Sequence, residues 1–215
     1  TALSEAWNDH FFVTIFPGAP SNARIHGFTL EPNGAGFALG EDKEMLRGIL
    51  SVGIDMGPEG ALYLTDWRTG WAPGDSGRIW KLDVPAAAGS QLRAETQALI
   101  AEPFTDRSVE DLVGFLSHPD MRIRTKAQFH LVDRNAGDEL EAVAAGSDHQ
   151  LARIHAIWGI GQLDRRDPGA AEVLVPLLQD ADAEIRAQAA KVLGDVRFAN
   201  AAGGLVSGLQ DPEAR

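Results

Sequence analysis

The sequence predicts an α+β chain of two segregated parts, antiparallel strands first and a solenoid of paired helices after them. Three observations predict this. Between Leu50 and Leu82, apolar residues alternate with smaller or polar ones, which is the period of strands. After Val84 the period lengthens to that of helices. From Ile123 onward, similar helices recur at an interval of about 30 residues, which is typical of a helical repeat.

Composition limits the classes of partner and chemistry. The chain has 215 residues, 44% of them hydrophobic, which is enough for one large or two small cores. Its net charge of −12 argues against nucleic acid as a partner, because phosphate binding needs clustered Lys and Arg. No apolar run approaches the ~20 residues that span a bilayer. The absence of cysteine excludes disulfides, thiol catalysis, a zinc ribbon and covalent c-type haem within these residues.

The first predicted strands lie before residue 40. Residues 1–9 are expected to be the remnant of an earlier blade or loop. Pro, Gly, Ser and Asn mark a loop at 17–22 and a turn at 31–34. Residues 41–48 are expected to cross to the next group of strands. The three strands are predicted at His10–Phe16, Ala23–Leu30 and Ala35–Leu39.

The stretch from Leu50 to Leu82 carries the second group of strands. Gly57-Pro58-Glu59-Gly60 predicts a tight turn, and a polar, Gly-rich loop covers residues 66–77. Three antiparallel strands in this order form most of one four-stranded propeller blade, and a generic β-meander is the alternative. The strands before residue 84 amount to about two blades, and a ring needs about four to eight. Further blades are therefore expected outside this chain, unless the strands form an open sheet.

Helices are predicted from residue 91 to the end of the chain. Ser108 is the expected N-cap of a helix to His118, with Asp111 three residues later, and Pro119 suits a first helical position. The repeated helices begin near Ile123, Ala152 and Ile185, with partner helices at 138–145 and 169–178. The last repeat is expected to be cut in half, with Leu205, Val206 and Leu209 packed on the helix 184–196 on one side only.

Family resemblance refines this prediction. The segment GIDMGPEGALYLTDW and the following GRIWKL resemble the last blade of the glucose and sorbosone dehydrogenase-like propellers, whose known members use pyrroloquinoline quinone (PQQ). They are still more similar to bacterial membrane-bound dehydrogenase-like proteins, in which HEAT repeats and a haem-binding cytochrome domain follow the propeller. The repeated L-x-D-x-x-[IL]-R-x-x-A-x-x-x-L pattern resembles bacterial HEAT-like repeats.

The resemblance implies a domain organisation and a function. It implies the last blades of an incomplete β-propeller at 1–84, a linker at 85–90 and an α-solenoid of HEAT-like repeats at 91–215. It also implies a sugar or alcohol oxidoreductase with PQQ and calcium in a periplasmic or secreted protein, of which this chain alone is expected to be inactive. The alternative function is a non-catalytic HEAT-repeat scaffold that binds other proteins and carries a β-rich appendage.

The expected ligand face gathers the loops at one end of the strands. Arg24 and Arg47 are the candidates for the quinone carboxylates, because guanidinium groups match carboxylate geometry, and the alternative is that both are structural or solvated. The family has two arginines two apart at this point, and residues 45–50 contain only Arg47. His10 and His26 do not match the family's catalytic histidine, so no catalytic residue is carried over. The other residues expected on this face are Asp66, Trp67, Arg68, Trp71 and Asp75.

Several of these polar residues also have structural explanations. Asp66 is either a calcium or sugar ligand beside a stacking tryptophan, or a cap for its own loop, and the second alternative is favoured. His155 is expected to be a packing residue of the array rather than a ligand. Arg124, Arg153 and Arg186 recur at equivalent positions and are expected to bond a neighbouring repeat through Asp120, Asp148 or Asp182. No spacing of acids or histidines predicts a metal site.

Overall fold

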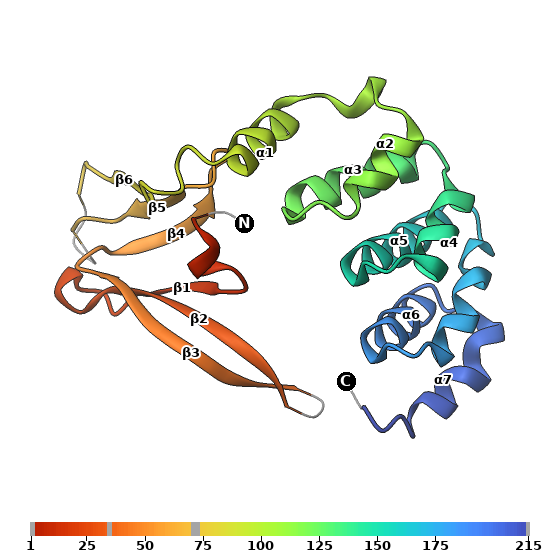
Figure 1. Ribbon diagram of the computed structural model, residues 1–215. Coiled ribbons are helices and arrows are strands. Elements are labelled where there is room, and N and C mark those ends of the chain that lie inside the picture. The colour runs from red at the N-terminus through yellow and green to blue at the C-terminus, as the bar shows by residue number, and fades with distance from the viewer. Residues whose placement is uncertain (1–2, 34–35, 70–73, 214–215) are drawn as a thin grey trace. The chain divides into compact units, whose positions relative to one another are not determined.

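The computed structural model describes residues 3–33, 36–69 and 74–213. The chain divides into two compact units, Thr1–Ala101 and Glu102–Arg215, which are described separately below. Strands are the main regular elements of the first unit and helices those of the second, as the change of period predicts (Figure 1). The helix α1, Gln91–Ala101, belongs to the first unit rather than to the repeats.

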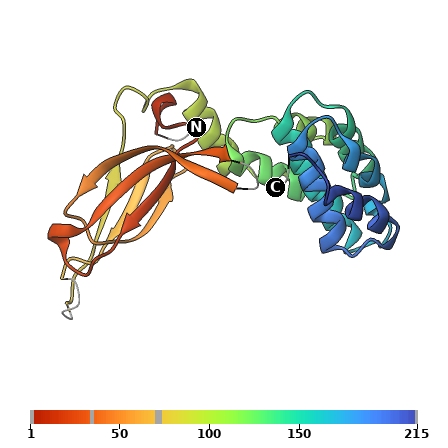
Figure 2. The same ribbon diagram turned by 90° about the horizontal axis from the view of Figure 1, so that it is seen from below.

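The first sheet has the order β1-β2-β3, with every pair antiparallel. Its strands are β1 (Phe11–Ile15), β2 (Arg24–Asn33) and β3 (Gly36–Arg47). β2 and β3 run side by side as a long hairpin in both views (Figure 1, Figure 2). The expectation that residues 41–48 cross between groups of strands is wrong, because most of them form the second half of β3. Polar cross-strand contacts hold this half, such as His26 Nδ1 at 2.7 Å from Asp42 Oδ1.

The second sheet has the order β4-β5-β6 and is also antiparallel. Its strands are β4 (Ser51–Met56), β5 (Leu62–Asp66) and β6 (Arg78–Leu82). The tight turn forms where the sequence predicts it, with the Gly57 amide donating to the Ala61 carbonyl at 2.8 Å. Each sheet has three strands, and the described residues form no closed propeller.

Both sheets contribute to one core in the first unit. Leu3, Ile25, Leu62 and Leu64 are almost fully buried, with Trp7 among the residues packed around them. Two short 3-10 turns, η1 (Glu5–Trp7) and η2 (Pro20–Asn22), flank β1.

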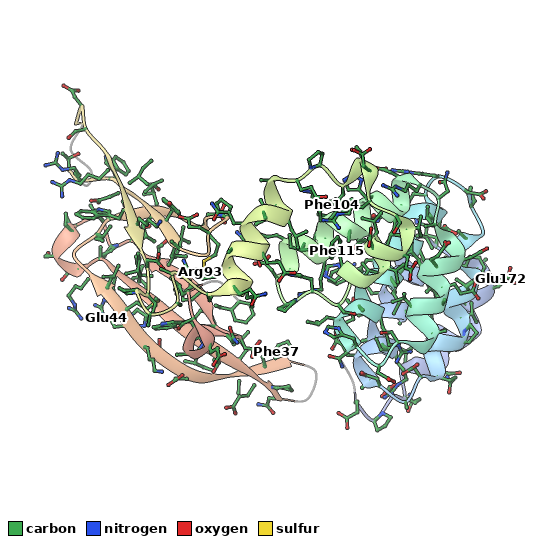
Figure 3. All side chains as sticks on the ribbon, turned by 45° about the horizontal axis from the view of Figure 1, so that its top comes forward. Phe37, Glu44, Arg93, Phe104, Phe115 and Glu172 are labelled. Carbon is green, nitrogen blue, oxygen red and sulfur yellow. The ribbon has the colours of Figure 1, made fainter. Side chains whose placement is uncertain are left out.

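Arg93 fastens α1 to the second sheet (Figure 3). Its side chain is only 4% exposed and donates to the Glu59 carbonyl and to Asp83 Oδ1, at 2.5 and 2.9 Å. Gly60 has a φ of +83°, and a Cβ there would lie 2.7 Å from Arg93 Nε. This turn therefore needs glycine for its backbone conformation and for its close approach to the arginine.

The second unit consists of helix pairs in two rows (Figure 1). We name the row of α2, α4 and η4 the first-helix row, and the row of α3, α5 and α6 the second-helix row. Phe104 and Phe115 stack with ring centroids 5.1 Å apart where the unit begins (Figure 3). The elements of this unit are η3 (Phe104–Asp106), α2 (Val109–Phe115), α3 (Met121–Asp133), α4 (Gly137–Gly146), α5 (Gln150–Asp164), η4 (Ala170–Gln179), α6 (Ala183–Asp195), η5 (Ala199–Ala201) and α7 (Ala202–Gly208).

Local side-chain chemistry sets where these helices begin. The capping box of Ser108 and Asp111 forms as the sequence predicts. Pro119 is not a first helical residue, however, because Asp120 is the N-cap of α3 and accepts from the Arg122 amide at 2.9 Å. Asp182 caps α6 in the same way.

A polar turn follows the first helix of each repeat. In each turn a side chain accepts the backbone amide two residues later, at 2.8–3.1 Å. This geometry identifies equivalent positions along the array. The acceptors are His118, Ser147, Asp180 and Asp211.

The repeated arginines bond these turns and not the aspartates expected from the sequence. Arg153 contacts Asp180 at 2.5 Å and Arg186 contacts Asp211 at 2.6 Å, so each reaches the turn acceptor of the following repeat. Arg124 differs, because its bonds go to the carbonyls of His118 and Pro119. Its Nε is buried and has no acceptor among the described residues.

Two segments of the second unit differ from expectation. Residues 170–179 form a 3-10 helix rather than an α-helix, and Pro176 within it lacks the amide that an α-helical bond requires. Val206 of α7 and Leu209 just after it are 66% and 79% exposed, so they are not buried against α6 as expected. Leu205 is the one of the three that is half-buried.

Candidate functional site

Some of the expected ligand-face residues lie at the ends of the strands. Arg24 and Arg47 are register partners at the open end of the β2–β3 hairpin, where β2 begins and β3 ends. Phe16, just before the loop 17–22, stacks on Trp67 with ring centroids 5.9 Å apart. Because β5 ends at Asp66 while the turn at Gly57 joins its other end, that turn lies at the opposite end of the second sheet. Trp71 lies outside the described residues.

Both candidate arginines already have intramolecular partners. Arg47 donates two hydrogen bonds to the carboxylate of Glu44, at 2.8 and 2.6 Å. These bonds hold the pKa of Glu44 below its ordinary value and raise that of Arg47. Arg24 makes one long bond, 3.4 Å, to the Asn22 carbonyl. A quinone carboxylate at this site would therefore have to compete with Glu44 for Arg47.

Asp66 is an internal acceptor in this structure. Its side chain accepts from the Leu50 amide at 3.2 Å and from Trp80 Nε1 at 2.9 Å, and the residue is 9% exposed. Asp66 thus joins the start of β4 to β6. Its role here is structural, but it bonds neighbouring strands rather than capping its own loop. Trp80, which the sequence did not single out, is its main side-chain partner.

The loop after Asp66 leaves an open depression of about 610 Å³. Arg68 donates to Ser76 Oγ at 3.0 Å, and Asp75 is exposed. Among the described residues no three His, Asp or Glu side chains gather as a cation site. The acids at this end are therefore separate groups rather than one site.

The second-helix row carries a groove of about 480 Å³. Most of its lining is apolar or amide-bearing, and it crosses three successive helices. The charged residues among its lining are Arg165, Lys191 and Asp195. The others are Thr125, Gln128, Phe129, Trp158, Gly161, Gln162, Gln188, Val192 and Val196.

Two aromatic side chains stand exposed in this groove. Phe129 on α3 is 50% exposed and Trp158 on α5 is 38% exposed. Gln188 of α6 holds the indole, because Trp158 Nε1 donates to Gln188 Oε1 at 2.8 Å. The aromatic surface is thus presented in a defined orientation across α5 and α6.

Close helix packing shapes the floor of the groove. A Cβ on Gly161 would lie 2.6 Å from Val192 Cγ1, so only glycine lets α5 and α6 approach this closely.

His155 supports Trp158 from below the surface. Its ring is 2% exposed, lies edge-on to the Trp158 ring at 5.1 Å, and places Nδ1 2.8 Å from Gln128 Oε1. Burial, with a smaller contribution from Arg124, lowers the pKa of His155 to about 4. The imidazole is therefore neutral at pH 7 and serves as a packing residue, as the sequence suggests.

The groove was not predicted from the sequence, although the sequence contains a pattern that indicates it. Phe129 and Trp158 occupy the same position in successive repeats and lie out of phase with the buried positions Ala127 and Ala156. Large aromatic residues outside the buried phase of a repeat indicate a surface that binds something.

The helical unit is the part of the chain that resembles a known class of repeat. Residues 137–215 match the family model of HEAT repeats. This match agrees with the paired helices and the recurring turns, so the helical region is HEAT-like. No curated protein and no solved structure matches the chain. In the described part of the chain, no helix is long and apolar enough to cross a membrane.

Proposed function

We propose that this chain is a non-catalytic scaffold whose HEAT-like unit binds a segment of another protein in the groove of the second-helix row. The exposed pair Phe129 and Trp158 is the observation that supports this most strongly. Aromatic residues dominate binding energy at protein interfaces, because they bury a large area at a small cost in side-chain entropy. The amide of Gln162 at the same groove can bond a partner's backbone.

Site-specific crosslinking in cells tests this proposal. A photoreactive residue at Thr125, which lines the groove, should capture a distinct protein that the same residue at Glu141 on α4 does not. The captured protein, once purified, should bind the Phe129→Ala variant at least tenfold more weakly than the unmodified chain. Phe129 is half exposed, so this truncation should leave the fold intact. Equal capture at both positions, or unchanged affinity, would refute the proposal.

A second proposal concerns the strand-rich unit. We propose that it belongs to a quinoprotein-like sugar or alcohol dehydrogenase in a periplasmic or secreted protein, with PQQ and calcium as cofactors and further propeller blades as its partner. The pairing of Arg24 with Arg47 and the stacking of Phe16 on Trp67 support it. The bonds of Arg47 to Glu44 speak against a free quinone site. Sugar-dependent dye reduction by the full-length protein with added PQQ and calcium, and its recovery in the periplasmic fraction, are the tests.

A further inference from the structure

The first-helix row has a groove of its own between α2 and α4. Its volume is about 530 Å³, and most of its lining is apolar. The floor consists of Val109, Val113, Ala142, Val143 and Gly146. The valines are half-buried, so the floor is open to a partner side chain.

Acidic side chains flank this floor. Glu110 and Glu139 line the groove together with Ser147, and no Lys or Arg does. Both glutamates are exposed, and neither makes an ion pair with any described residue. An apolar strip with a negatively charged rim is thus left without a partner among the residues that the structure describes.

The whole first-helix row shares this charge. Its three helices contain six acidic residues and no Lys or Arg, whereas the helices of the second-helix row contain Arg122, Arg124, Lys126, Arg153, Arg186 and Lys191. The six acids are Glu110, Asp111, Asp138, Glu139, Glu141 and Glu172. Negative charge is therefore concentrated on the helices of the first-helix row. It favours a partner with positive charge at this surface.

We propose that this groove docks a cationic amphipathic helix of a partner protein. A groove between two helices accepts the side-chain ridge of a third helix, whose apolar residues at i and i+4 would cover Val109 and Val113. Lys and Arg beside that apolar face would meet Glu110 and Glu139. This surface is distinct from the groove with Phe129 and Trp158, so the inference does not depend on the function proposed above.

A model peptide provides a direct test. The probe is a fluorescein-labelled helical peptide composed of leucine and lysine, and its binding to the full chain is measured by fluorescence anisotropy at 0.15 M salt. The double variant Glu110→Gln/Glu139→Gln should bind at least tenfold more weakly. Ala142→Arg should weaken binding to a similar extent, because it places a cation in the floor at an exposed position that the fold tolerates.

A matched control separates the groove from the general negative charge of the chain. Glu141→Gln/Glu172→Gln removes the same number of charges from the same helix row but outside the groove, and should change affinity less than twofold. Glu172 is labelled in Figure 3. Phe129→Ala should also leave affinity unchanged, because that side chain lines the other groove. Equal losses in the two double variants, equal binding of a leucine–glutamate peptide, or loss on Phe129→Ala would each overturn the proposal.

Discussion

Asp66 is a buried acid with both oxygens engaged by the protein itself. Replacing it with alanine would leave the Leu50 amide and the Trp80 indole without their acceptor. Buried donors that lose an acceptor cost about 1–3 kcal/mol each, so Asp66→Ala should destabilise the first unit by about 3 kcal/mol. Urea unfolding followed by tryptophan fluorescence measures this.

Asp75 provides the matched control at the same end of the sheet. It is exposed and makes no hydrogen bond with any described residue. Asp75→Ala should therefore change the unfolding free energy by less than about 0.5 kcal/mol. If Asp66→Ala were equally harmless, Asp66 would be free to act as a ligand, and the structural assignment would be wrong.

His155 makes the stability of the helical unit depend on pH. Its pKa of about 4 in the folded state lies below its ordinary value of 6.5, so the unfolded chain binds the proton more strongly. Stability from this residue is complete above pH 6.5 and is lost as the pH falls toward 4. The unfolding free energy should drop by about 2 kcal/mol between pH 7 and pH 5 because of this residue. His155→Gln should remove that part of the pH dependence, and an unchanged slope in thermal or urea unfolding would contradict the assignment.

At the scale of the helical elements, the arginine contacts between repeats suggest a stabilising substitution. Arg153 and Arg186 each meet a carboxylate in the turn of the following repeat, whereas the position equivalent for Arg124 is Ser147. Ser147→Asp should keep the turn, since aspartate accepts the same amide bond at Asp180. It should also give the buried Arg124 a carboxylate and raise the unfolding free energy by about 1 kcal/mol.

The reciprocal variant, Asp180→Ser, measures how much such a contact contributes to stability. Asp180→Ser removes an existing contact in which both side chains are mostly buried, 13% and 15% exposed. Leaving Arg153 unpaired there should cost about 3 kcal/mol. Calorimetric melting of both variants is the measurement. A destabilising Ser147→Asp would show that the surroundings of Arg124 do not accept an acid.

The period of the sequence predicts which elements are strands and which are helices, but it does not predict all of their bounds. The strand prediction missed residues 41–47, because that half of β3 is largely solvent-exposed and polar. Its sequence therefore shows no alternation of apolar residues. Its register comes from pairing with β2, such as Arg24 opposite Arg47, which no local pattern contains. Residues 170–179 have helical periodicity, and the 3-10 geometry becomes evident only in the structure.

The candidate sites were less predictable than the fold, because they depend on contacts between distant residues. The engagement of Asp66 by Trp80 needs the pairing of β5 with β6. The groove that exposes Phe129 and Trp158 needs the stacking of three repeats. The sequence therefore contains the side chains of each site, whereas the repeat register determines which of them meet.

At the scale of the whole molecule, burial falls off toward α7. This helix has no buried residue, and Val206 and Leu209 are largely exposed. Repeat arrays derive most of their stability from contacts between neighbouring repeats, so a sparsely packed helix opens first. We expect amides at 205–209 to exchange faster than those at 127–131 in α3. Hydrogen exchange followed by mass spectrometry measures this, and equal protection in the two segments would contradict the expectation.

Two neighbouring glycines in α7 refine that test. A Cβ on Gly203 meets nothing within 4 Å, so Gly203→Ala should stabilise the helix by about 1 kcal/mol and slow exchange at 205–209 about fivefold. A Cβ on Gly204 would lie 2.7 Å from Leu178 Cδ1, so Gly204→Ala should give no such gain, because the side chain would push α7 away from η4. Equal gains from both substitutions would show that α7 opens without regard to its contact with Leu178. The fast exchange would then reflect helix propensity alone and not the thin packing of the last repeat.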